Sequence, residues 1–275
     1  AAQRGGLIVL DLAAPAGPRQ TARLELEGLA ASVRLDGDRA YVTAGWGGLH
    51  VVDVAQPDAP RAVGHVSGIV SDAAVTGTWA FVVSRNLTMV DLTDPARPVQ
   101  RAKLAEWADA VELVDGVLFA GVSDDPDRAD RRGQLASYDV RDAGRNRPQL
   151  GSLEVGQPVR DLLPLGGGRL LVLTRAELLE VDAADPARMR VLRRAAVPGH
   201  LRRLAGEGVP PHYAAGAGDG LLAVDGATLA LSPVPGAETL GHAASLAALD
   251  ERTLVVEDEA DASTDAGRLR IVDVA

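Results

Sequence analysis

LHVVDV (49–54) is the stretch of sequence that decides the fold, because variants of it recur along the whole chain. The seven copies are, in chain order, LIVLDL (7–12), LHVVDV (49–54), LTMVDL (87–92), LASYDV (135–140), LLEVDA (178–183), LLAVDG (221–226) and LRIVDV (269–274). Their aspartates lie 38 to 48 residues apart, about 44 on average. Strand-forming repeats of this length are typical of the blades of a β-propeller.

The residues of one repeat support this interpretation. Residues 28–66 contain four short apolar stretches, at 31–35, 40–43, 49–54 and 61–66, which Gly, Asp and Pro separate. Short runs bounded in this way predict antiparallel strands. Because no segment has a sustained helical period between capping residues, we expect almost no helix. The sequence therefore predicts one all-β domain over residues 1–275, built from four-stranded antiparallel blades.

The strand count favours six blades. We name the four strands of a blade a to d, from the centre outward. Six a–b pairs are expected near 31–43, 71–83, 109–121, 159–173, 201–215 and 244–256. Six d strands are expected near 20–26, 61–66, 98–104, 149–155, 188–197 and 229–235. We predict that the N-terminal strands complete the last blade, because such closure removes the free sheet edge.

Seven c strands are one too many for six blades. The hairpin over residues 7–26 already supplies a c and a d strand together, so residues 269–274 are expected to form an extra edge strand. Two alternatives stay open: residues 1–6 and the first strand lie outside the blades, or the chain is a piece of a longer protein with another blade.

The recurring aspartate is interpreted as structural. A proline follows it four residues later in several repeats, as in Asp53 with Pro57 and Asp91 with Pro95. An Asp at a strand end accepts hydrogen bonds from the backbone N–H groups that follow it, and Pro fixes the turn. Equivalent positions in a propeller diverge, which opposes a shared metal site.

The best copy of the repeat, GLHVVDVAQPDAPRAVGHV (48–66), resembles the LVIVD repeat of a family of β-propellers. The resemblance extends over essentially the whole chain and weakens after the second repeat. Asp142-Ala143 replaces the Asp-Pro pair in the fourth copy, and the copy from Leu221 lacks that turn. The resemblance implies a secreted or cell-surface protein of bacteria or archaea, with no assigned activity and no catalytic residues. The start at Ala1 would suit a mature N-terminus after signal cleavage.

The composition excludes several classes of protein. The net charge of −10 opposes nucleic-acid binding, because affinity for phosphates comes from clustered positive charge. The absence of Cys excludes disulfides, thiolate zinc sites and Cys nucleophiles. No apolar run approaches the ~18 residues that a membrane span needs. Since aromatic residues make up only 3% of the chain, we expect a core of Val, Leu, Ile and Ala.

The d–a and b–c loops of such blades emerge on one face, where a partner or ligand could bind. The candidate residues on this loop face are Trp46, Arg85, Trp107, Asp109, Arg160, His200, Arg202 and His242. We expect an acidic side, with Asp72 and Asp109, and a basic side, with Arg160, Arg202 and Arg203. Such asymmetry could orient a charged partner. The alternative is that these are ordinary solvated loop residues.

Two acidic loops are candidate calcium sites, although neither has the spacing of an EF-hand. The weak candidates for Ca²⁺ ligands are Asp124, Asp125, Asp127, Asp130, Asp258 and Asp261. We interpret both loops, 123–134 and 257–268, as solvated.

The predicted function is a non-enzymatic, extracytoplasmic binding or scaffold protein without a cofactor. It would engage a protein partner through the loop face, for instance as an accessory subunit of a membrane-associated complex. The first alternative is a hydrolase or lyase that uses His200 or His242, which lie in matching Gly-His pairs. The second is a propeller that binds a small ligand or a glycan.

Overall fold

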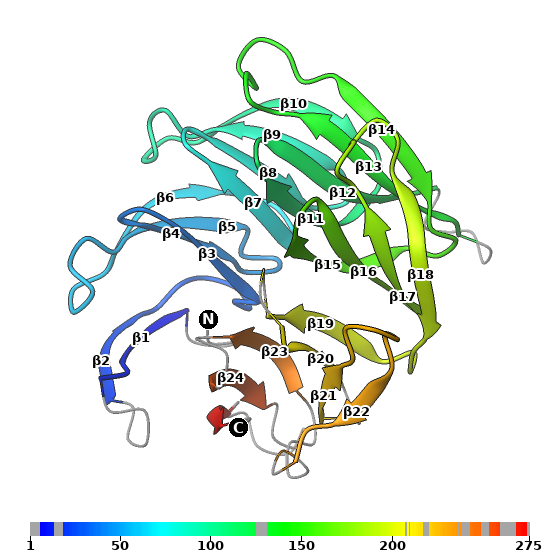
Figure 1. Cartoon of the computed structure of the whole chain (residues 1–275). Coiled ribbons are helices and arrows are strands. Elements are labelled where there is room, and N and C mark those ends of the chain that lie inside the picture. The colour runs from blue at the N-terminus through cyan, green and yellow to red at the C-terminus, as the bar shows by residue number, and fades with distance from the viewer. Residues whose placement is uncertain are drawn as a thin grey trace. The chain divides into compact units, whose positions relative to one another are not determined.

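The computed structural model describes residues 6–13, 19–124, 131–206, 208, 210–216, 220–235, 237, 243–248, 253–258 and 268–273. All the secondary-structure elements in this part of the chain are β-strands, as the sequence predicts. No helix among the described residues could span a membrane. The strands form five four-stranded antiparallel sheets, one three-stranded sheet and one two-stranded sheet (Figure 1). The chain divides into two compact units, residues 1–120 with 140–147, and residues 121–139 with 148–275.

The first unit contains two complete sheets and the N-terminal hairpin. The hairpin consists of β1 (Leu7–Asp11) and β2 (Arg19–Leu24). The first sheet has β3 (Ser32–Asp36), β4 (Arg39–Thr43), β5 (Leu49–Asp53) and β6 (Arg61–Val66). The second has β7 (Asp72–Thr76), β8 (Trp79–Val83), β9 (Leu87–Asp91) and β10 (Val99–Ala105). In each sheet the strands follow one another in chain order.

The third four-stranded sheet also keeps chain order. It consists of β11 (Ala108–Val114), β12 (Val117–Ser123), β13 (Gly133–Asp139) and β14 (Gln149–Glu154).

The second unit contains the remaining sheets. One has β15 (Val159–Gly166), β16 (Arg169–Thr174), β17 (Glu177–Asp182) and β18 (Arg190–Ala196). The next has β19 (Leu201–Ala205), β20 (His212–Gly216), β21 (Gly220–Val224) and β22 (Leu231–Pro233). The last described sheet has three strands, β23 (Ala243–Ala248), β24 (Thr253–Asp258) and β25 (Arg268–Asp273).

Neighbouring sheets within a unit share one apolar layer. In the first unit, Leu49 and Val51 of β5 pack in one cluster with Ala73 and Val82 of the next sheet. The central strands are therefore buried on both faces, which explains why the repeated LHVVDV-type segment is almost continuously apolar. The core is built mainly from Val, Leu and Ala, as the scarcity of aromatic residues predicts.

The predicted closure of the propeller is wrong in one respect. β25 pairs with β24 over six residues, from Thr253↔Asp273 to Asp258↔Arg268, and so occupies the third position of its sheet. β1 pairs with β2 in a separate two-stranded sheet, which packs on the first sheet through Leu7 and Leu24. Each terminal c strand thus pairs with its neighbour in the sequence, so residues 268–273 and not the N-terminal hairpin take the c position beside β24. Five complete four-stranded blades are present in the described residues, so the predicted count of six is not confirmed.

The structural interpretation of the recurring aspartate is confirmed. In five repeats its Oδ1 accepts the N–H of the residue two positions later, at 2.9 to 3.2 Å: Asp11 from Ala13, Asp53 from Ala55, Asp91 from Thr93, Asp182 from Ala184 and Asp225 from Ala227. Hydrogen bonds from Thr93, followed by one from Arg101, lower the pKa of Asp91 to about 2. These carboxylates close the c–d turns.

Candidate functional site

Three exposed apolar side chains lie on adjoining loops of the first unit. Leu29, Trp46 and Ile69 are 43%, 58% and 70% exposed, and we name them the apolar loop patch. The backbone N–H of Leu29 donates to the Ala44 carbonyl at 2.9 Å, on the loop that carries Trp46. The N–H of Val70 donates to the Gly45 carbonyl at 2.8 Å, which fixes the Ile69 loop beside it. Backbone hydrogen bonds therefore hold all three loop segments together.

The structure brings together two predicted residues of the same loop type, Arg85 and Trp107. The Arg85 guanidinium carbon lies 4.9 Å from the centre of the Trp107 ring, a cation–π geometry. The Arg85 carbonyl also accepts the N–H of Ala108 at 3.3 Å. This pair follows the blade pattern, in which the b–c loop of one blade meets the d–a loop of the next.

The predicted acidic side is only partly present. Asp72 is 5% exposed, and its Oδ2 accepts the N–H of Val111 at 3.0 Å, so it joins two sheets and does not face a partner. Asp109 is half-buried in β11 between the buried residues Ala108 and Ala110.

The predicted basic side is partly present in the second unit, because Arg203 pairs with Asp161 at 3.9 Å while Arg175 lies near Arg160 and Arg202. Arg160 Nη1 donates to the carbonyls of Gly199 and Leu201 at 2.8 and 2.7 Å, on either side of His200. Burial lowers the pKa of Arg160, and the charges of Arg202 and Arg175 lower it further. These guanidinium groups therefore lie close enough to repel one another.

Most of the candidate calcium ligands lie outside the described residues, namely Asp125, Asp127, Asp130 and Asp261. The predicted site residue His242 also lies outside them. Asp124 accepts the N–H of Arg132 at 2.7 Å, which closes the base of its loop, and Asp258 is the last residue of β24. The described part of the chain holds no group of three or more His, Asp or Glu side chains that could bind a metal ion.

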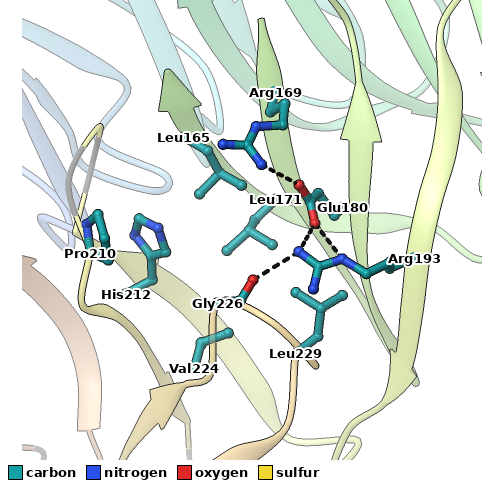
Figure 2. Close-up of a pocket in the computed structure, with 10 residues that line it drawn as sticks. All are labelled: Leu165, Arg169, Leu171, Glu180, Arg193, Pro210, His212, Val224, Gly226 and Leu229. Atoms are coloured by element: carbon teal, nitrogen blue, oxygen red, sulfur yellow. Dashed lines mark hydrogen bonds and ion pairs between the residues drawn. The ribbon is translucent and has the colours of Figure 1, made fainter. Parts of the chain in front are cut away.

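A pocket that the sequence analysis missed lies between the sheets β15–β18 and β19–β22 of the second unit (Figure 2). Its volume is about 140 Å³. Leu165, Leu171, Val224 and Leu229 form its apolar walls. The polar side chains that line it are Arg169, Glu180, Arg193 and His212.

Glu180 is the buried centre of an ion triad in this pocket. It is 1% exposed, and its Oε1 accepts Arg169 Nη1 at 3.0 Å while its Oε2 accepts Arg193 Nε at 2.7 Å. Arg193 also donates to the carbonyls of Gly226, at 2.8 Å, and Ala227, so it joins the two sheets. A buried carboxylate needs this pairing, because an unpaired buried charge is costly.

The sequence contained a signal for this triad. Glu180 occupies the central position of its LLEVDA segment, where the other six copies have Val9, Val51, Met89, Ser137, Ala223 and Ile271. Its strand partner Arg193 stands where two other blades have Gly64 and Gly151. Glu180 thus occupies a repeat position that is mostly apolar, and its strand partner Arg193 occupies a position that is Gly in two other blades. This combination indicates that the blade contains an ion pair that those two blades lack.

His212 completes the polar lining. The residue is 7% exposed, and Nδ1 lies 2.7 Å from the Gly206 carbonyl oxygen. A carbonyl only accepts hydrogen bonds, so Nδ1 carries the proton and donates it, and in the neutral ring Nε2 is an acceptor. Figure 2 shows His212 across the pocket from the Glu180–Arg193 pair.

Comparisons with known proteins agree with the fold. A family model described as LVIVD repeat matches residues 27–67 and 67–103, and no curated protein matches the sequence. The chain resembles the computationally designed protein Ika8, with a TM-score of 0.64, 9% identity, and coverage of 100% of this chain and 92% of that chain. It resembles the WD40 β-propeller domain of Doa1 with a TM-score of 0.61, 10% identity, and coverage of 98% and 86%. At these identities the likeness establishes the fold alone. The chain thus contains LVIVD repeats over residues 27–103 and has the β-propeller fold.

Proposed function

We propose that this propeller is a non-enzymatic, extracytoplasmic scaffold that binds a protein partner through its d–a and b–c loops. The apolar loop patch of Leu29, Trp46 and Ile69 carries the proposal. The partner would belong to a membrane-associated complex, in which this chain is an accessory subunit. The extracytoplasmic location rests on the resemblance to LVIVD-repeat proteins.

The chemistry of the patch favours a protein partner. Exposed apolar groups that lie together are costly in water and mark interaction sites. Trp is enriched at the centres of protein interfaces, where it contributes large contact area with few rotatable bonds. Because backbone hydrogen bonds already fix the loops, binding would cost little ordering entropy.

Photocrosslinking from single positions tests the proposal. A photoreactive phenylalanine analogue is placed at Trp46 or Ile69, and at Leu35 as the control. Leu35 is 72% exposed and precedes the Asp36-Gly37 turn at the a–b end of its blade, away from these loops. The experiment uses cells that naturally produce the chain, with separate cytoplasmic and envelope fractions.

We expect an envelope protein to be crosslinked from positions 46 and 69 and not from position 35. Equal crosslinking from all three positions, or none from 46 and 69, would refute the loop face as the interface. Crosslinking and recovery in the cytoplasmic fraction alone would refute the location. A product-forming activity that His200→Ala abolishes would favour an enzyme instead.

A further inference from the structure

The ion triad has two positive charges and one negative charge. One positive charge in the pocket therefore has no opposite charge among the side chains that line the pocket. Glu180 carries one negative charge and contacts two guanidinium groups. Arg193 uses its N–H donors within the protein, because it donates to Glu180 and to two backbone carbonyls. The nearest acid in register with Arg169, Asp182, pairs with Arg190 at 2.8 Å.

Arg169 is therefore the group that can receive an anion. Among the described residues its only hydrogen bond is the one from Nη1 to Glu180, at 3.0 Å. A guanidinium carries five N–H donors, so most of its donors are unused there. Its side chain is 51% exposed, which leaves it accessible from solvent while Glu180 fixes its orientation.

His212 presents a second unused polar group. Its Nδ1–H donates to Gly206, and Nε2 has no hydrogen-bond partner among the described residues. The ring is more than nine-tenths buried and lines the pocket. A buried acceptor without a partner is unfavourable, and a ligand donor at this position would satisfy it.

The remaining walls set the size and character of the ligand. Leu165, Leu171, Val224 and Leu229 are apolar, and the volume is about 140 Å³. An apolar cavity of about 150 Å³ accommodates one benzene molecule. The pocket therefore fits a compact apolar body with one anionic group and one hydrogen-bond donor.

We propose that this pocket binds a small hydroxy acid. The carboxylate contacts the Arg169 guanidinium, the hydroxyl donates to His212 Nε2, and a branched or cyclic hydrocarbon body lies against the leucines. Glu180 acts as a positioning residue, because it holds Arg169 in place without contacting the ligand. This site consists of residues of the second unit, none of which belongs to the apolar loop patch, and it does not depend on the proposed protein partner.

Calorimetric titration of the whole chain with matched probes tests the proposal without any substitution. The probes are 2-hydroxyisovalerate, isovalerate, which lacks the hydroxyl, and 3-methylbutane-1,2-diol, which lacks the charge. We expect 2-hydroxyisovalerate to bind about tenfold more tightly than isovalerate, because isovalerate leaves the buried acceptor unpaired. The diol should bind at least tenfold more weakly than the hydroxy acid, since it cannot pair with Arg169.

Three variants assign the contacts. Arg169→Met removes the charge and keeps the aliphatic stem, and we expect it to weaken hydroxy-acid binding about tenfold or more. Arg194→Met is the matched control, because Arg194 lies on β18 of the same sheet and pairs with Glu177 at 3.5 Å, outside the pocket lining. His212→Asn keeps a donor for the Gly206 carbonyl and removes Nε2, so it should abolish the preference for the hydroxyl. Circular dichroism confirms that each variant is folded.

Several results would overturn the proposal. No saturable binding of 2-hydroxyisovalerate to the wild-type chain at millimolar concentrations would refute the site. Equal affinity for isovalerate would refute the role of His212. If Arg169→Met and Arg194→Met weakened the binding of 2-hydroxyisovalerate equally, the affinity would depend only on the overall charge of the protein, and the role of Arg169 would be refuted. Loss of crosslinking at Trp46 leaves these titrations unchanged, so the two proposals fail separately.

Discussion

Glu180 and Arg193 replace an apolar residue and a glycine of the repeat, and a double-mutant cycle shows whether they act as a unit. The variants are Glu180→Val, Arg193→Gly and the double substitution, which restores the pair that Val51 and Gly64 form in the first sheet. Glu180→Val leaves Arg169 and Arg193 without their carboxylate, and Arg193→Gly leaves Glu180 with Arg169 alone. The double change removes both charges from the strand pair.

The structure gives the expected magnitudes. Removing one partner of a buried ion pair costs roughly 3–5 kcal/mol. The side chain of Arg193 is 35% exposed and can reach water, so Glu180→Val should cost less, about 2–3 kcal/mol. Arg193→Gly leaves Glu180 almost fully buried with Arg169 alone, and about 3 kcal/mol is expected. The double variant should lose only about 2 kcal/mol, which gives a coupling free energy of about 3 kcal/mol.

Urea unfolding followed by circular dichroism measures the cycle, with thermal unfolding as a second readout. For a domain of this size about 1 kcal/mol corresponds to a shift in Tm of roughly 2–4 °C, so Glu180→Val should lower Tm by about 4–12 °C. The double variant should melt above Arg193→Gly. If the two single effects add to give the double effect within about 0.5 kcal/mol, the side chains are independent and the interpretation as a unit is wrong.

Three further predictions concern other parts of the fold. Gly64→Ala should destabilise the first unit by about 3 kcal/mol or more, because the new Cβ would lie 1.8 Å from the Pro95 carbonyl oxygen. Gly37→Ala, where φ is +55° and no atom lies within 4 Å of the new Cβ, should cost only about 1 kcal/mol in the same thermal unfolding assay; equal losses would contradict the steric argument. The pKa of Asp91 is lowered to about 2, so its stabilisation is complete above its unfolded pKa of about 4 and is lost as the pH falls toward 2. Asp91→Asn should therefore lower Tm at pH 7 and approach the wild type near pH 2, and a Tm difference that is constant with pH would refute this. Trp46→Ala should change the free energy of unfolding by less than about 0.5 kcal/mol in urea, because the side chain is exposed; a larger loss would mean that Trp46 packs in the fold.

The positions of the strands could be predicted from the sequence because blade repeats are local. A segment such as 31–43 contains both strands and the turn of one a–b pair, and β3 and β4 occupy it. The contact between Arg85 and Trp107 could be predicted for the same reason, since the b–c loop of one blade lies next to the d–a loop of the following blade.

The pairing of the strands at the two ends of the chain could not be predicted from the local sequence. LIVLDL and LRIVDV fit the c position equally well, and the choice depends on which hairpin each one joins. The pocket was missed for a different reason. Glu180 and Arg169 resemble surface charges when they are considered one at a time, and only the comparison of equivalent repeat positions identifies Glu180 as buried.

The Glu180–Arg193 pair has a consequence for how this chain could have grown by duplication. Arg193 reaches the carbonyls of Gly226 and Ala227, in a turn that lacks the Asp-Pro pair found at Asp94-Pro95 and Asp185-Pro186. Gly64 instead closely approaches the Pro95 carbonyl of a standard turn. An exchange or deletion of either blade alone would therefore separate Arg193 from the carbonyls that it contacts. The contacts of Arg193 therefore help to specify which blade follows the one that contains Glu180.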